Sequence, residues 1–148
     1  MTEHRVTRVE DVMSVDLVTA TPHDDVTSAL SKMADAHVRR LPVVEANGDG
    51  ATLLGVITDR DVRLAANSPY LWGTSDQIAE ELRGLRVADI MSADVAVVTP
   101  RVPLSEAAQI MIERRVGGLP VIEREPGRQR LVGIVTRTDC LAHLTRIL

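Results

Sequence analysis

The sequence predicts an α/β (α+β) fold of two β-α-β-β-α repeats packed sheet to sheet about a pseudo-twofold axis. First, short motifs recur at one constant offset, 133 − 55 = 78 residues, without a gap. Second, each copy carries a helical apolar stripe between short β-runs that are apolar on both faces. Third, one such copy would bury few residues from water, so the two copies are expected to share a core.

The recurring motifs set the predicted boundaries. We place one repeat at 8–67, a second at 87–146, and a linker at 68–86. The motifs are Asp-Val-Met-Ser (11–14) and Asp-Ile-Met-Ser (89–92), Thr21-Pro22 and Thr99-Pro100, Leu41-Pro42-Val43-Val44 and Leu119-Pro120-Val121-Ile122, and GVITDRD (55–61) and GIVTRTD (133–139).

Each repeat is expected to open with a short β-strand, at 17–20 and at 95–98. Thr-Pro then ends the strand, because proline cannot donate to a ladder. A helix with one buried face follows, since the apolar residues recur at i, i+3, i+4, i+7 and i+8. These residues are Val26, Ala29, Leu30, Met33 and Ala34 in the first copy, and Leu104, Ala107, Ala108, Met111 and Ile112 in the second.

A β-hairpin and a last helix complete each repeat. In the first copy the strands are expected at 41–44 and 53–58, around a turn rich in Gly and Asn, and the second copy has Pro126-Gly127 at that place. The last helix should begin near Asp59 and near Arg137. In the linker a short helix is predicted from Ser75 to about Arg83, and the aromatic residues Tyr70 and Trp72 are expected to cover the edge of the core. A dimer contact or a lid is the alternative for these two.

Composition excludes several classes of function. The net charge of −4 gives no reason to expect general nucleic-acid binding. One cysteine cannot form an intrachain disulfide, and no apolar run approaches the length of a membrane helix. With no signal-peptide core at the N-terminus, we expect a cytoplasmic protein. The four histidines share no metal-ligand spacing, and neither a P-loop nor a catalytic set of side chains is present. We therefore predict no enzyme activity, no metal and no catalytic cofactor.

The duplicated Thr-x-x-Asp can be interpreted in two ways. It is a capping-box pattern, in which the hydroxyl and the carboxylate satisfy free N–H groups at a helix start. The same helix start can also bind an anion. Thr58 or Thr136 could then donate to a phosphate, while Asp61 or Asp139 could accept the hydroxyls of a ribose. The cap holds under both interpretations. Gly55 and Gly133 are expected to let strand and helix pack closely.

The motifs resemble those of CBS domains, named for cystathionine β-synthase, and the chain resembles their tandem pair, the Bateman module. About 120 of the 148 residues carry this resemblance. It implies a regulatory sensor of adenosine compounds such as AMP, ADP, ATP or S-adenosylmethionine. Family members usually adjoin an enzyme, channel or transporter, whereas this chain resembles a stand-alone pair. The resemblance also implies a homodimer that signals to a regulated protein.

The resemblance further implies two clefts, each combining parts of both repeats. Apolar members would sandwich the purine, and backbone groups of the first strand would recognise its edge. Cleft one would contain Val56, Thr58, Arg60, Asp61, Val95, Ala96, Val116, Gly117 and Gly118. Cleft two would contain Leu17, Val18, Val38, Arg39, Arg40, Ile134, Thr136, Thr138 and Asp139.

The two clefts are not expected to be equal. Cleft two has Arg39 and Arg40 where cleft one has Gly117 and Gly118. Arginine suits phosphate oxygens, so we expect cleft two to prefer the more highly phosphorylated nucleotide. The alternative for the two arginines is a solvated helix end. The alternatives for the whole chain are a structural or dimerisation module with vestigial clefts, and a binder of S-adenosylmethionine.

Overall fold

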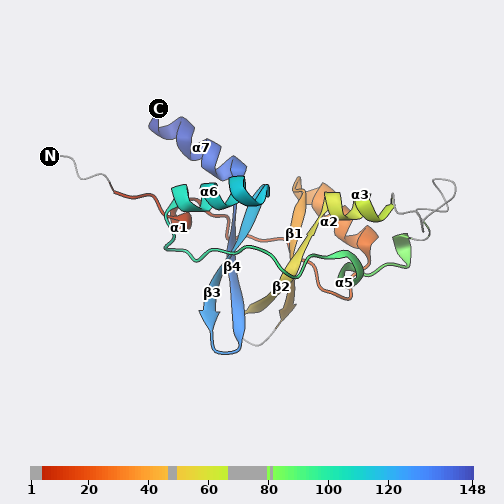
Figure 1. Cartoon of the computed structure of the whole chain (residues 1–148). Helices are drawn as coiled ribbons and strands as arrows, with labels where there is room; N and C mark the ends of the chain where they lie inside the picture. Colours follow the sequence, from red (N-terminus) through yellow and green to blue (C-terminus); the bar gives the residue numbers. More distant parts are fainter. Residues whose placement is uncertain (1–4, 47–49, 67–79, 81) are drawn as a thin grey trace. The chain divides into compact units, whose positions relative to one another are not determined.

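The computed structural model describes residues 5–46, 50–66, 80 and 82–148, and the chain forms two compact units. One unit is the continuous segment Val18–Val95, and the other joins the residues up to Leu17 to Ala96–Leu148. In Figure 1 the second unit therefore combines the red start of the chain with its blue end. The mixed α/β fold class is confirmed, whereas the packing of one repeat against the other stays a prediction.

The described residues of the continuous unit include an antiparallel hairpin and the helices that pack with it. They are α2 (Val26–Ala36), β1 (Arg40–Ala46), β2 (Ala51–Thr58), α3 (Asp59–Ala66) and α5 (Val87–Ile90). Its core is aliphatic, since the buried cluster consists of Ala20, Val26, Ala29, Met33, Leu41, Val43, Ile57, Val62 and Val87.

The other unit has the same parts in a different chain order. They are α1 (Val9–Val12), α6 (Leu104–Arg114), β3 (Gly118–Glu125), β4 (Arg128–Thr136) and α7 (Arg137–Ile147). Its buried cluster consists of Val9, Val98, Leu104, Ala107, Met111, Leu119, Val121 and Val135. Because Val9 is fully buried among residues after Val98, α1 belongs structurally to the second repeat.

The predicted hairpins and the start of each last helix are confirmed. Leu41 pairs with Ile57 and Leu119 with Val135, and each hairpin has a register shift at the equivalent place. The next helix starts immediately, α3 at Asp59 and α7 at Arg137. The linker predictions, including Tyr70 and Trp72, fall largely outside the described residues.

The amphipathic helices α2 and α6 are confirmed, but their buried faces are narrower than predicted. Val26, Ala29 and Met33 are buried in α2, as are Leu104, Ala107 and Met111 in α6. The positions at i+8 were wrong, because Ala34 is exposed and Ile112 is 70% exposed. The buried residues occupy only the i, i+3 and i+7 positions of each helix. The side of the helix that carries the i+8 residue is therefore left exposed to solvent.

The first β-run of each repeat is not a regular strand. In each run only the last residue forms a bridge, Ala20 with Val43 and Val98 with Val121, both parallel. The Thr-Pro that follows explains the end of the pairing. The residues before the bridge are not paired with another strand, which corrects the prediction of strands at 17–20 and 95–98.

The two glycines of the repeated motif contact an extended segment, not a helix. A Cβ on Gly55 would lie 2.4 Å from the carbonyl oxygen of Ser92. A Cβ on Gly133 would lie 2.7 Å from the Met13 sulfur and 3.0 Å from the Ser14 carbonyl oxygen. The prediction that they serve strand–helix packing was therefore wrong. Because glycine has no side chain, the Met-Ser end of the other repeat's Asp-Val-Met-Ser or Asp-Ile-Met-Ser motif can pack closely against each of these positions.

Asp24 connects the end of the first β-run to α2. It accepts hydrogen bonds from the backbone N–H (2.9 Å) and hydroxyl (2.9 Å) of Thr21, and Lys32 Nζ lies 3.3 Å from Oδ2. Burial acts to raise the pKa of this carboxyl, but the hydrogen bonds from Thr21 and Lys32 outweigh it and hold the pKa below its usual value.

Replacing Asp24 by asparagine should lower the free energy of unfolding by about 1 kcal/mol at neutral pH. Because the folded-state pKa is depressed, the carboxylate stabilises above its unfolded pKa of about 4, and the effect is lost as pH falls through the folded-state value. Urea unfolding of both proteins at several pH values measures this. An equal difference at pH 7 and well below pH 4 would contradict the assignment.

Candidate functional site

Both Thr-x-x-Asp motifs form reciprocal caps at the start of the last helix of their repeat. At α3 the Thr58 N–H donates to Asp61 Oδ2 (2.9 Å), and the Asp61 N–H donates to the Thr58 hydroxyl (3.1 Å). At α7 the Thr136 N–H donates to Asp139 Oδ2 (2.8 Å), and the Asp139 N–H donates to the Thr136 hydroxyl (3.3 Å). The capping interpretation is therefore confirmed in both repeats.

The caps leave polar atoms that a ligand could use. In both carboxylates the hydrogen bonds to threonine fall on Oδ2. Among the described residues, no hydrogen-bond donor is assigned to Oδ1 of Asp61 or Asp139. The first helical N–H is satisfied by a carbonyl, that of Arg39 at α3 and that of Gly117 at α7. Each helix start thus presents a half-buried carboxylate oxygen that can accept further hydrogen bonds.

Arg39 and Arg40 lie at the helix start of their own unit. The Asp59 N–H donates to the Arg39 carbonyl at 2.9 Å, and Arg40 pairs with Thr58 across the hairpin. Arg39 is exposed and Arg40 is half-buried. The backbones of both arginines therefore lie close to the Thr58 cap. In the other unit, Gly118 pairs with Thr136, so the equivalent positions have no side-chain charge.

The extended residues before each bridge have unused backbone groups. Within the described ranges, backbone hydrogen bonds of the two runs are assigned only to Ala20 and Val98, apart from the Thr19 carbonyl, which accepts from Lys32. Leu17, Val18, Val95 and Ala96 have no such partner in that part of the chain. These are the residues predicted to recognise the edge of a purine.

The backbones of Val56 and Ile134 are already in use. Val56 exchanges two hydrogen bonds with Ser92, and Ile134 exchanges two with Ser14. These residues can therefore offer a ligand only their side chains, of which Val56 is buried and Ile134 half-buried. The remaining predicted residues are exposed or half-buried except Gly118, which is buried; they are Arg60, Val38, Val116, Gly117 and Thr138.

The predicted site residues divide between the two units. One unit holds Val56, Thr58, Arg60, Asp61, Val95, Val18, Val38, Arg39 and Arg40, and the other holds Ala96, Val116, Gly117, Gly118, Leu17, Ile134, Thr136, Thr138 and Asp139. Each predicted cleft draws on both units, so its assembly stays a prediction.

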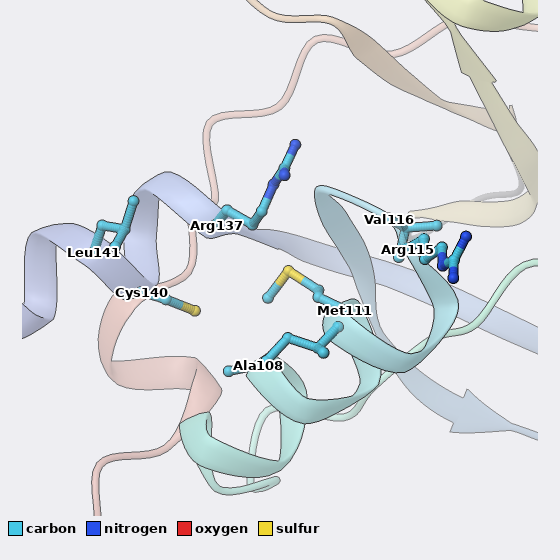
Figure 2. A pocket seen from close by; sticks show the side chains of 8 residues that line it. Ala108, Met111, Arg115, Val116, Arg137, Cys140 and Leu141 are labelled. Carbon is cyan, nitrogen blue, oxygen red and sulfur yellow. The ribbon is translucent and has the colours of Figure 1, made fainter.

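An apolar groove between α6 and α7 was not anticipated from the sequence. Its volume is about 460 Å³, and Figure 2 shows Met111 and Cys140 extending into the space between the two helices. Burial first, and then the Asp139 carboxylate, raise the pKa of the Cys140 thiol, so it packs as a small apolar group. The signal in the sequence was Ile112, which was assigned to the core. The groove is lined by Ala108, Met111, Ile112, Arg115, Val116, Arg137, Cys140 and Leu141.

None of the described helices is both long and apolar enough to cross a membrane. In the same residues, no group of three or more His, Cys, Asp or Glu side chains could hold a metal ion.

Relatives of this chain occur as separate proteins and as parts of enzymes. A CBS domain-containing protein of Dictyostelium discoideum is 38% identical over 140 residues, which cover 95% of this chain and 92% of the relative. The inosine-5'-monophosphate dehydrogenase of Methanocaldococcus jannaschii is 33% identical, and the match covers 92% of this chain but only 23% of the enzyme.

Two solved structures have a similar fold and contain ligands. CBSX2 of Arabidopsis thaliana in complex with AMP has a TM-score of 0.74 and 29% identity, covering 95% of this chain and 97% of that one. The CBS domain pair of protein MJ0100, with 5'-methylthioadenosine and S-adenosyl-L-methionine, has a TM-score of 0.69 and 25% identity, covering 93% and 99%. The model of the CBS domain matches residues 9–68 and again 87–146. This chain therefore belongs to the CBS domain family and contains a pair of these domains.

Proposed function

We propose that this protein is a non-catalytic regulatory sensor that binds adenine nucleotides, AMP, ADP or ATP, at its two Thr-x-x-Asp helix starts. The observation that carries the proposal is the duplicated cap, in which Thr58–Asp61 and Thr136–Asp139 share the same two reciprocal backbone-to-side-chain hydrogen bonds. Each leaves a carboxylate oxygen available for ribose hydroxyls at a helix N-terminus that favours a phosphate.

The unpaired extended segments supply the rest of the site. The backbones of Leu17 and Val18, and of Val95 and Ala96, can exchange hydrogen bonds with the edge of an adenine, as strand backbones do with one another. We assign them to the two clefts named above, in which each helix start faces the extended segment of the other repeat. The AMP complex of a relative that is 29% identical supports an adenosine ligand.

Isothermal titration calorimetry with AMP, ATP and S-adenosylmethionine tests the proposal. We expect saturable binding of at least one adenine nucleotide. Absence of binding of every adenosine compound at millimolar concentration would contradict it and favour the structural module. Preferential binding of S-adenosylmethionine would favour the second candidate, which the ligands of the MJ0100 pair support.

Arg39 and Arg40 should favour nucleotides with more phosphates. Replacing either by alanine should weaken ATP binding about tenfold, since a hydrogen bond to a charged group contributes about 1.5–3 kcal/mol. AMP binding should change less. The matched control is Arg124→Ala, which removes the same charge near the end of β3 remote from Gly118. Equal ATP affinity in the wild type and both variants, measured by calorimetry, would contradict this role.

We further propose that the protein acts as a cytoplasmic homodimer that signals to a regulated protein. A bound nucleotide can transmit a signal only if it binds two conformations with different affinities. Because the ligand would contact both repeats, it would favour one relative position of the two units. Comparing the hydrodynamic radius and the hydrogen exchange of the protein with and without AMP would detect that shift.

A further inference from the structure

Lys32 links helix α2 to the first β-run of the first repeat. Its Nζ donates a hydrogen bond to the Thr19 carbonyl oxygen at 3.0 Å and lies 3.3 Å from Asp24 Oδ2. Thr19 immediately follows Leu17 and Val18, whose backbones are assigned above to the edge of the adenine in cleft two. The lysine therefore fixes the chain directly beside the proposed adenine contact.

Four residues form what we call the polar clamp: Thr19, Thr21, Asp24 and Lys32. Asp24 accepts hydrogen bonds from the N–H and the hydroxyl of Thr21, both at 2.9 Å, and pairs with Lys32. The clamp thus holds the chain on both sides of Ala20, the residue that bridges to β1. The side chains of Lys32 and Asp24 are 39% and 26% exposed, so their ion pair contributes little to stability. Its effect is to orient the ammonium group toward the Thr19 carbonyl.

The second repeat has apolar residues where the first has the polar clamp. At the offset of 78 residues, the counterparts of Thr19, Asp24 and Lys32 are Val97, Val102 and Ile110. Val102 and Ile110 are partly buried and pack against the core cluster of their own unit. Side chains of valine and isoleucine can neither donate nor accept a hydrogen bond. The clamp is therefore a property of the first repeat and not a general consequence of the fold.

We propose that Lys32 is a positioning residue for the adenine-binding segment of cleft two, and that cleft one has no equivalent of it. This inference rests on the nucleotide sites proposed above and adds a determinant of affinity that belongs to one of them. A segment that is already ordered loses less conformational entropy when a ligand binds to it. Lys32 acts through the Thr19 carbonyl, so it need not contact the nucleotide.

The first test measures AMP affinity at each site by calorimetry. Lys32→Met keeps most of the aliphatic side chain and removes the hydrogen-bond donor. In an Asp61→Asn background, where binding reports mainly on cleft two, it should weaken AMP binding about tenfold, since fixing the backbone of one residue has a cost of that order. In an Asp139→Asn background, which reports on cleft one, it should change nothing. Lys32→Arg, which keeps the charge and N–H donors, should restore most of the affinity.

The second test follows hydrogen exchange of the full chain without a nucleotide. The Ala20 N–H donates to the Pro42 carbonyl at 2.9 Å, and in the second repeat the Val98 N–H donates to the Pro120 carbonyl at 3.1 Å. Lys32→Met should accelerate exchange of the Ala20 amide about tenfold, because the run opens locally more often without the clamp. The Val98 amide is the matched control and should exchange at the wild-type rate.

The outcomes separate this inference from the proposed function. A wild type that binds no adenosine compound would overturn the nucleotide sites, and this inference with them. A wild type that binds AMP, with Lys32→Met equally tight at cleft two or equally weakened in both backgrounds, would overturn the positioning role alone. An unchanged exchange rate at Ala20 would show that the clamp does not order the run, whatever the ligand.

Discussion

Replacing Gly55 by alanine is expected to lower the free energy of unfolding by about 1–3 kcal/mol. The added methyl group would lie 2.4 Å from the Ser92 carbonyl oxygen, which cannot move without disturbing the backbone. That oxygen accepts the Val56 N–H at 2.9 Å, and the Ser92 N–H donates back to the Val56 carbonyl at 2.9 Å. The clash therefore acts on both hydrogen bonds that attach the segment after α5 to β2.

Gly133→Ala is the matched control, because it makes the same change in the other repeat. Here the nearest atom is the flexible Met13 side chain, and the Ser14 carbonyl oxygen lies at the edge of tolerance. Alanine also restricts the unfolded chain, which stabilises by about 0.4–1 kcal/mol and offsets part of the cost. Urea unfolding should show the larger loss for Gly55→Ala. Equal losses, or a larger one for Gly133→Ala, would contradict the assigned contacts.

Asp139→Asn is expected to weaken AMP binding about 10–100-fold at the site that it belongs to, since hydrogen bonds to a charged group contribute about 1.5–3 kcal/mol. The asparagine oxygen can still accept the Thr136 N–H, so the cap and the fold should persist. Calorimetry measures the affinity, and thermal unfolding serves as the control. If the variant bound AMP at every site as tightly as the wild type does, the proposed contact between Asp139 and the ribose would be contradicted.

Asp61→Asn is the paired variant. Together, the two aspartate variants decide whether Arg39 and Arg40 contact a nucleotide bound at Asp61 or one bound at Asp139. Arg39 lies beside Asp59 in its own unit, whereas cleft two assigns it to Asp139. Double-mutant cycles for ATP affinity separate these possibilities. Coupling of Arg39→Ala with Asp139→Asn would support cleft two. Coupling with Asp61→Asn would contradict it and place the arginines in the site of their own unit.

Much of the fold could be predicted because both repeats have the same order of apolar runs, turns and capping motifs. The stripe from Val26 to Met33 indicated a helix, and its counterpart from Leu104 to Met111 confirmed the period. The hairpins and the starts of α3 and α7 followed from local signals in the same way. The capping role of Thr58 and Thr136 also needed only local chemistry, which is why it was correct.

The errors concern contacts between residues distant in sequence. Apolar character marked 17–20 as a strand, but a strand also needs a partner, and only Ala20 has one. Ile112 was assigned to the core because periodicity does not distinguish a side covered by the same chain from a side left uncovered. Position 55 requires glycine because the Ser92 carbonyl oxygen lies close to it, and no local sequence pattern connects these two residues. The clefts, which need both units, stay predictions for the same reason.

The placement of α1 has a consequence for the order of folding during synthesis. Val18–Val95 is continuous, so all the residues of that unit are available once the ribosome has passed Val95. Val9, by contrast, belongs to a buried cluster whose other members begin at Val98, and Leu119 of that cluster lies 119 − 9 = 110 residues away. The segment around α1 must therefore wait while the whole continuous unit is made. Nascent chains should acquire protease resistance in Val18–Val95 first, and the segment at Val9 should be protected last.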